Sequence, residues 1–284
     1  MTSQKPAVIL GVPYDASSSF RRGPALAPTS IRAALWSSAG NSWTEALADI
    51  SDPSVLVDAG DLTIEDGRAR EIIEAGVAAQ LADGKKPILL GGDHSITYPV
   101  LRAVGATVEP LTILHIDAHA DLYDEFEGDR FSHACPFARI MEEKLAARLV
   151  QVGIRTLTSH QRMQADRYGV EIIDMRAWER GMRPAVRADE AVYLSVDLDG
   201  LDPAFAPGVS HPEPGGLSVR DVISLIQNLE APMVGADIVE CNPAVDPTRI
   251  TSVVAAKLLK EIAAAMHCVP EPWRAPKDGG SVRA

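Results

Sequence analysis

The sequence predicts an α/β fold in which helices cover both faces of a mostly parallel, eight-stranded sheet. Short apolar, β-branched runs alternate along the chain with longer amphipathic stretches, a pattern typical of strand–helix–strand units. The apolar runs are nearly continuous, which indicates strands that are buried on both faces, as in a parallel sheet. Ligands of such sheets bind at the carboxyl ends of the strands, so functional residues are expected there.

Each element is placed by its own apolar pattern. We expect strands at residues 7–12, 55–58, 87–90, 111–116, 149–152, 170–173, 191–196 and 233–239. Helical periodicity predicts helices at residues 28–36, 65–82, 96–104, 136–147, 159–168, 218–228 and 247–267. We expect a single domain over residues 1–269, followed by a Pro- and Gly-rich flexible tail over residues 270–284.

Composition narrows the class of protein. The chain has 284 residues, of which 46% are hydrophobic and 23% are charged, which is enough for one large core. Its net charge of −12 argues against nucleic acid and anionic membrane as partners, and it is compatible with a cationic substrate. The three cysteines are too few for a disulfide framework, and we interpret Cys135 and Cys241 as buried packing residues. We see no signal peptide and no segment that could span a bilayer, so we expect a cytoplasmic protein.

Six side chains of the metal-binding type follow three of the apolar runs. They are His94 in GGDHS, Asp117, His119 and Asp121 in DAHAD, and Asp197 and Asp199 in VDLD. On an extended backbone, residues at i, i+2 and i+4 share one face, so the ligands within one run converge. Two imidazoles and four carboxylates are too many for one ion and suit two divalent ions, which in turn suit hydrolysis.

The donor types and their charge indicate the metal and the substrate. An oxygen-rich site with some imidazole suits Mn²⁺, and Ni²⁺, Co²⁺ and Fe²⁺ are also compatible with it. Four carboxylates balance two divalent cations, so a hydroxide between the ions makes the centre negative by one. Such a centre accepts a cationic electrophile better than a phosphate, which disfavours a phosphatase.

Two long loops, residues 122–131 and 202–216, begin directly after these ligands, and we expect both to wall the pocket. The first loop carries four acids against Arg130, which favours substrates with cationic or neutral tails. In the second loop, His211 and Glu213 are equally consistent with a role beside the metals and with a surface position. We interpret His115 as a packed core histidine that points to the opposite side from His119.

The runs GGDHS, DAHAD and SVDLDGLDPAFAPG resemble the three signature segments of the ureohydrolases, the arginase and agmatinase family. The resemblance extends from GVPYDASSSFRRGPALAPTSIR to TSVVAAKLLKEIA, nearly the whole chain, and is strongest to plant-type arginases and their bacterial agmatinase-like relatives. It implies a three-layer αβα sandwich, a homo-oligomer (a trimer or hexamer) and two Mn²⁺ ions per chain. It also implies which residues surround each ion. One ion would be held by His94, Asp117, Asp121 and Asp197, and the other by His119 together with Asp117, Asp121, Asp197 and Asp199.

The resemblance further implies a catalytic set and a reaction. His133 in SHACPF matches the family's proton-shuttle histidine, and Glu240 in ADIVECNP matches the glutamate that grips the guanidinium. With the ligand Asp121, these residues would cleave the guanidino C–N bond of agmatine or arginine to release urea and an amine, in arginine catabolism or polyamine metabolism. The Asn- and Ser-bearing carboxylate clamp of animal arginases is absent, so the sequence leaves the choice between the two substrates open.

Three alternatives stay open at this point. One is a guanidinobutyrase or another guanidino or formimino hydrolase. The second is a single-zinc, deacetylase-type amidohydrolase on the related fold, against which the GGDHS histidine and the second set of ligands argue. The third is a catalytically inactive family member, against which the presence of both His133 and Glu240 beside all six ligands argues.

Overall fold

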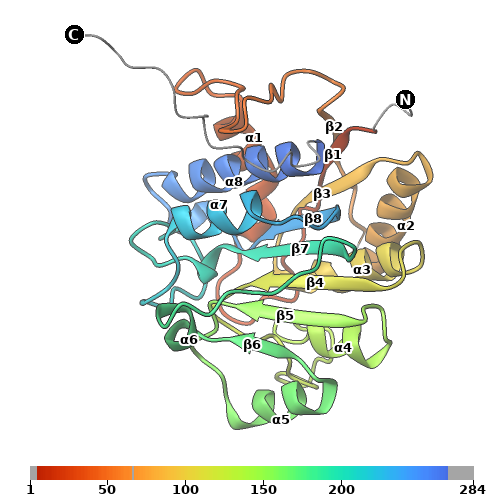
Figure 1. The fold of residues 1–284 in the computed structure, drawn as a ribbon, viewed down its shortest axis with the longest axis vertical. Helices are drawn as coiled ribbons and strands as arrows, with labels where there is room; N and C mark the ends of the chain where they lie inside the picture. The colour runs from red at the N-terminus through yellow and green to blue at the C-terminus, as the bar shows by residue number, and fades with distance from the viewer. Residues whose placement is uncertain (1–4, 66, 268–284) are drawn as a thin grey trace, which may run out of the picture.

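The computed structural model describes residues 5–65 and 67–267, and its centre is one eight-stranded sheet (Figure 1). The strand order is β2-β1-β3-β8-β7-β4-β5-β6, and every neighbouring pair is parallel. The strands are β1 (Ala7–Gly11), β2 (Leu56–Asp61), β3 (Lys86–Leu90), β4 (Leu111–Ile116), β5 (Arg148–Val152), β6 (Glu171–Ile173), β7 (Ala191–Asp197) and β8 (Met233–Val239). The eight predicted strands are confirmed. The predicted tail over residues 270–284 and Cys268 lie outside the described residues.

Helices form a layer on each face of the sheet (Figure 1). They are α1 (Ala27–Leu35), α2 (Ala69–Ala82), α3 (Thr97–Gly105), α4 (Pro136–Glu142), α5 (Ser159–Tyr168), α6 (Met175–Glu179), α7 (Val219–Gln227) and α8 (Ile250–His267), with the 3-10 helices η1 (Pro24–Leu26), η2 (His94–Ile96), η3 (Leu198–Gly200) and η4 (Pro243–Val245). On one side α8 packs against α1 and α7, and on the other side α2, α3, α4 and α5 pack in sequence. The predicted three-layer sandwich is therefore confirmed.

The strands are buried on both faces because their side chains alternate between two cores. In β4, Leu114 and Ile116 join the core beneath α1, α7 and α8. Leu111 and Ile113 of the same strand join the core beneath α2, α3 and α4. Odd-numbered residues of β4 thus point toward α3 and α4, and this parity decides where the polar residues at the end of the strand lie.

Three helices differ from the prediction by three residues or more at one end. The helix predicted from residue 247 begins at Ile250. The helix predicted from residue 65 begins at Ala69, because Gly67 has a φ of 77° and Arg68 is not helical. The helix predicted to reach residue 147 ends at Glu142, because Lys144 has a φ of 56° and turns the chain toward β5. The short helix α6 was not predicted, since five residues are too few to show helical periodicity.

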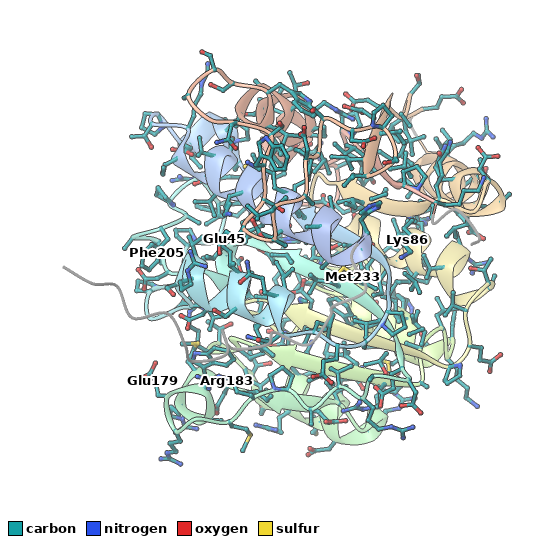
Figure 2. All side chains as sticks on the ribbon, turned by 45° about the horizontal axis from the view of Figure 1, so that its top comes forward. Glu45, Lys86, Glu179, Arg183, Phe205 and Met233 are labelled. Atoms are coloured by element: carbon teal, nitrogen blue, oxygen red, sulfur yellow. The ribbon has the colours of Figure 1, made fainter. Side chains whose placement is uncertain are left out.

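The segment between α1 and β2 is fastened to the outer helices by Glu45 (Figure 2). Its carboxylate accepts a 2.8 Å bond from Arg220 on α7 and lies 3.1 Å from Lys257 Nζ on α8. The hydrogen bond from Arg220 is the main cause that lowers the pKa of Glu45. No helix of the described chain is long and apolar enough to cross a membrane.

Four neighbouring strands in the middle of the sheet, β3, β8, β7 and β4, deliver the polar residues to one edge. The turn after β3 reaches this edge through Gly92, where a Cβ atom would lie 1.5 Å from the carbonyl oxygen of Tyr14. Only glycine permits that approach, and it lets η2 present His94 directly above the sheet.

Candidate functional site

His94 faces three carboxylates at the carboxyl ends of β4 and β7. Its Nδ1 lies 3.0–3.3 Å from oxygens of Asp117, Asp121 and Asp197, and it is buried without a hydrogen-bond partner. The opposite nitrogen, Nε2, lies 3.0 Å from Ser195 Oγ, whose own proton is donated to Asp237 at 2.7 Å. Ser195 therefore accepts from Nε2–H, and the lone pair of Nδ1 is directed at the carboxylates.

A lone pair that faces three carboxylates is favourable only when a positive charge lies between them. Burial opposes charge on His94, yet the three carboxylates raise its pKa well above the usual value. In metal-free protein a proton on Nδ1 thus takes the place of a cation. The donor set of one imidazole and several carboxylates fits a divalent ion of the Mn²⁺ type.

His119 faces a second group of carboxylate oxygens. Its Nδ1 lies 3.2 Å from Asp199 Oδ2 and 3.4 Å from Asp117 Oδ1. Asp117 thus directs Oδ2 toward His94 and Oδ1 toward His119, so one carboxylate could serve two cations. Burial, followed by repulsion from Asp117, raises the pKa of Asp199 to about 7, so this cluster needs compensating positive charge. All six predicted ligands lie in these two adjoining groups.

Two residues of the site have backbone conformations that residues other than glycine rarely adopt. Asp121 has a φ of 48° and Glu240 has a φ of 61°. Such left-handed residues are strained, and they cluster at functional sites where the surrounding contacts enforce them. Here the strain turns the Asp121 carboxylate toward His94 and the Glu240 carboxylate toward His133.

Glu240 and His133 form a buried pair beside the ligand cluster. Nδ1 of His133 lies 2.9 Å from Glu240 Oε1, and the same oxygen accepts a 2.9 Å bond from the backbone N–H of His94. The second oxygen, Oε2, is buried and has no partner. Burial lowers the pKa of His133, but the Glu240 carboxylate outweighs burial and raises it to about 9. On the far side of the ring, Nε2 lies 2.8 Å from Ser19 Oγ.

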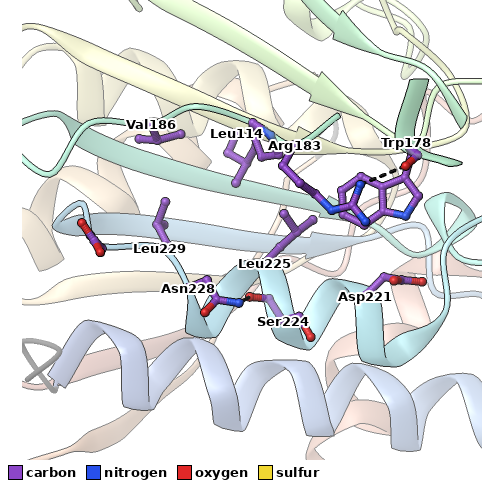
Figure 3. A pocket seen from close by; sticks show the side chains of 11 residues that line it. Leu114, Trp178, Arg183, Val186, Asp221, Ser224, Leu225, Asn228 and Leu229 are labelled. Carbon is purple, nitrogen blue, oxygen red and sulfur yellow. Dashed lines mark hydrogen bonds between the residues drawn. The ribbon is translucent and has the colours of Figure 1, made fainter. Parts of the chain in front are cut away.

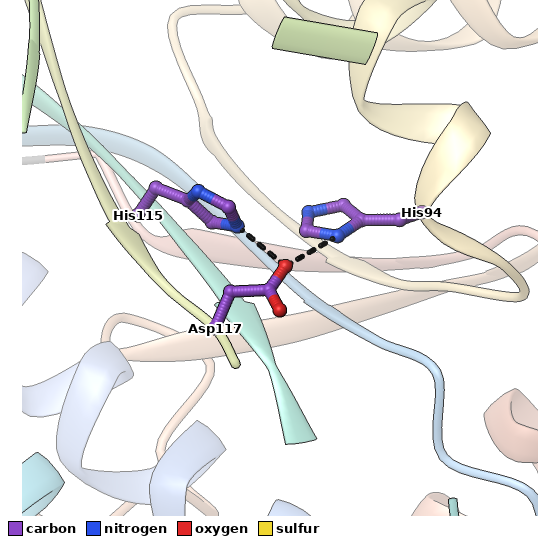
Figure 4. A group of neighbouring side chains, drawn as sticks. All are labelled: His94, His115 and Asp117. Atoms are coloured by element: carbon purple, nitrogen blue, oxygen red, sulfur yellow. Dashed lines mark hydrogen bonds and ion pairs between the residues drawn. The ribbon is translucent and has the colours of Figure 1, made fainter. Parts of the chain in front are cut away.

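The interpretation of His115 as a core histidine that points away from His119 is wrong in its direction. Residues 115, 117 and 119 share one parity, and His115 Nε2 lies 2.8 Å from Asp117 Oδ2 (Figure 4). The side-chain nitrogen of Gln151, which can only donate, lies 3.0 Å from His115 Nδ1. The proton of the neutral ring is therefore on Nε2, and His115 donates it to Asp117 and orients that carboxylate.

A cavity of about 270 Å³ opens onto the cluster. It is lined by Ser19, His119, Asp121, Tyr123, Phe126, His133, Ala134, Thr156, Gln161, Asp197, Asp199, His211 and Glu240. The loop over residues 122–131 lines the cavity as expected, but none of its four acids, which were expected to influence the choice of substrate, is in the lining. Asp124 instead pairs with Arg139 at 2.6 Å and with Arg130 at 3.1 Å. That loop contributes the uncharged rings of Tyr123 and Phe126.

The second long loop supplies His211, which lines the cavity with its ring centroid 5.1 Å from that of His133. The base of this loop is held by Arg155, which the sequence analysis missed. The Arg155 guanidinium donates to the backbone carbonyls of Asp199 at 2.7 Å, Gly200 at 3.2 Å and Glu213 at 2.5 Å. A single arginine after β5 gave no recognisable pattern, because all of these partners are backbone atoms.

Another cavity, of about 400 Å³, lies on the α7 side of the sheet (Figure 3). Its lining includes Leu114, Leu225 and Leu229, and the guanidinium of Arg183 lies 3.6 Å from the centroid of the Trp178 ring. This cavity contains none of the clustered ligand residues, and the catalytic chemistry therefore belongs to the cavity at the strand ends.

Comparison with known proteins identifies the arrangement. The sequence profile of the Arginase family matches residues 5–265. Arginase 1 of Arabidopsis thaliana is 48% identical over 90% of this chain and 80% of its own. An agmatinase of Halalkalibacterium halodurans is 33% identical over 90% of each chain. The structure of an arginase from Medicago truncatula superimposes with a TM-score of 0.88 at 45% identity, covering 94% of this chain and 89% of that one.

The comparison also corrects one expectation. The Arabidopsis relative is named as a mitochondrial protein, which contradicts the expectation of a cytoplasmic one. In contrast, the resemblance of the three signature segments is confirmed by a match that covers almost the whole described chain. The chain belongs to the arginase family, whose members are hydrolases that depend on a pair of metal ions.

Proposed function

We propose that the chain hydrolyses L-arginine to urea and L-ornithine, with two Mn²⁺ ions bound. Two kinds of finding support this substrate. The relatives that share about half of its residues are named arginases, whereas the agmatinase is more distant. The observation that carries the proposal is the unpartnered, buried Oε2 of Glu240, an acceptor that a guanidinium would satisfy.

The six residues of the cluster are the proposed ligands. His94 with Asp121 and Asp197 would hold one ion, His119 with Asp199 would hold the other, and Asp117 would contact both. When bound, the two ions supply a water molecule whose pKa is lowered toward neutrality. Their mixed oxygen and imidazole donors favour Mn²⁺, with Ni²⁺ and Co²⁺ as the next candidates.

Glu240 is proposed to bind and orient the guanidinium. Its Oε1 is already held by the His94 backbone and by His133, which fixes the carboxylate plane. Its Oε2 remains to accept a charge-assisted hydrogen bond from a guanidinium N–H. A fixed carboxylate restricts the position of the central guanidinium carbon, and such orientation accounts for a large share of catalysis in bimolecular reactions.

His133 is proposed to protonate the leaving amine. With its pKa raised to about 9 by Glu240, the ring carries a proton at neutral pH in the absence of ions. It lines the cavity, and Ser19 Oγ beside Nε2 can return a proton from solvent. A histidine that lines the cavity and has a raised pKa is a candidate for the general acid.

The test is urea release from L-arginine, agmatine and guanidinobutyrate by protein loaded with Mn²⁺ or Ni²⁺, combined with elemental analysis. We expect two ions per chain and the highest kcat/KM with L-arginine. Preference for either of the other compounds would replace the proposed substrate. One zinc per chain would instead favour the deacetylase-type alternative. Light scattering should give a trimer or hexamer, the proposed assembly.

A further inference from the structure

The cavity is lined by both charged and uncharged side chains. Its acids, Asp121, Asp197, Asp199 and Glu240, are all in the ligand cluster or at the proposed guanidinium site. The remaining lining includes Tyr123, Phe126, Thr156 and Gln161, with no acid and no Lys or Arg. A substrate carboxylate in this cavity would therefore have to be recognised by neutral hydrogen-bond donors.

Gln161 provides such a donor, and the capping of helix α5 fixes its orientation. Its Oε1 lies 3.2 Å from both the backbone nitrogen and the Oγ1 of Thr158, the residue that caps α5. A backbone N–H can only donate, so the atom that faces it must be the amide oxygen. The amide NH₂ therefore points away from the cap.

The NH₂ group of Gln161 has no protein partner in the described part of the chain, although the side chain is only 3% exposed. Gln161 lines the cavity and lies in the first turn of α5, whose positive dipole end also favours an anion. Because Gln161 lines the cavity, this unpartnered donor is available to a ligand that can accept a hydrogen bond from it.

We propose that the Gln161 amide recognises the α-carboxylate of the substrate and so selects L-arginine over agmatine. This inference rests on the proposed function, because it assigns a residue to the far end of the same substrate. The same amide would reject a tail that ends in an ammonium group, since its oxygen is already engaged by Thr158.

The decisive variant is Gln161→Glu. Glutamate is also accepted at this position of a capping box, so the cap on α5 is retained while the NH₂ donor becomes a carboxylate oxygen. We expect KM for L-arginine to rise about 10- to 100-fold, as when a polar site loses its partner, with kcat little changed. KM for agmatine should stay the same or fall. Gln80→Glu is the control, because it makes the same amide-to-carboxylate change on α2, where the side chain is only partly buried, keeps an oxygen for Lys85 and does not line the cavity.

Parallel changes for the two substrates, or no change for either, would overturn the role of Gln161. Thermal unfolding of both variants checks that the capped helix is intact. The proposed function fails in a different way: wild-type protein would then release urea from agmatine and not from L-arginine, and the assignment of Gln161 would fall with it.

Discussion

His133 and Glu240 act as one unit, since each fixes the charge of the other. Burial alone would keep His133 neutral, and the carboxylate 2.9 Å away reverses that preference. Burial alone would raise the pKa of Glu240. The attraction of His133 outweighs burial, so the net effect is a lowered pKa. The pair therefore keeps a proton available beside the cavity while leaving one carboxylate oxygen for a ligand.

Replacing His133 tests its role as the proton donor. His133→Asn should keep two ions per chain, because His133 is not among the proposed ligands. Its turnover should fall about 10²–10⁴-fold, the usual contribution of general acid catalysis. Elemental analysis and steady-state kinetics measure the two quantities, and unchanged turnover would remove His133 from the mechanism.

The charge of His133 should depend on Glu240 in a measurable way. In metal-free protein the ring should titrate near pH 9, and in Glu240→Gln its pKa should be lower, because the main interaction that opposes burial is lost while the weaker ones with Asp121 and Asp93 remain. Since the pKa in the folded state is raised, the stability from this pair is present below about pH 6.5 and is lost as pH rises through about 9. NMR titration of the ring tests this, and equal pKa values in the two proteins would contradict the pairing.

At the scale of elements, the sequence predicted the strands well because each is a continuous apolar run between two helical layers. The six candidate ligands lie together in the structure because each of them follows such a run. The sequence-based predictions were wrong where contacts between residues distant in sequence determine the direction or the partner of a side chain. The direction of His115 was predicted from a wrong parity, and Asp124 pairs with Arg139 and Arg130 instead of lining the pocket.

The connection between η3 and the loop after it should depend on Arg155. Arg155→Met removes its bonds to the carbonyls of Asp199 and Glu213, and we expect a loss of about 2–4 kcal/mol from the free energy of unfolding. Retention of metal during dialysis should also weaken, since η3 presents Asp199. Arg162→Met, a change at an exposed arginine of α5, is the matched control and should leave both quantities unchanged.

At the scale of the whole molecule, the sheet brings the ends of four neighbouring strands together, and the cost of crowding their acids is offset by bound cations. Burial and then repulsion from Asp199 raise the pKa of Asp197 well above its usual value. This shows that a negative charge at Asp197 is unfavourable when no ions are bound. The fold and the metals are therefore expected to stabilise each other.

Removing the ions should lower the melting temperature, and returning Mn²⁺ should restore it. A ligand that binds only the folded state contributes about 2.7 kcal/mol when its free concentration is 100 times its Kd.

Asp121→Ala should lose at least one ion and nearly all activity, and its melting temperature should respond less to Mn²⁺. Full metal content in this variant would contradict the ligand assignment. Calorimetry and elemental analysis provide the measurements.

The two oxygens of Asp117 point to different histidines, which limits how the metal centre can be redesigned. A variant that uses a single metal ion would have to lose one of the two histidines and the carboxylates beside it. Asp117 would still direct one oxygen toward the position that no longer holds an ion. A single-ion site would therefore also need a changed Asp117 at the end of β4, since that residue faces both halves of the centre.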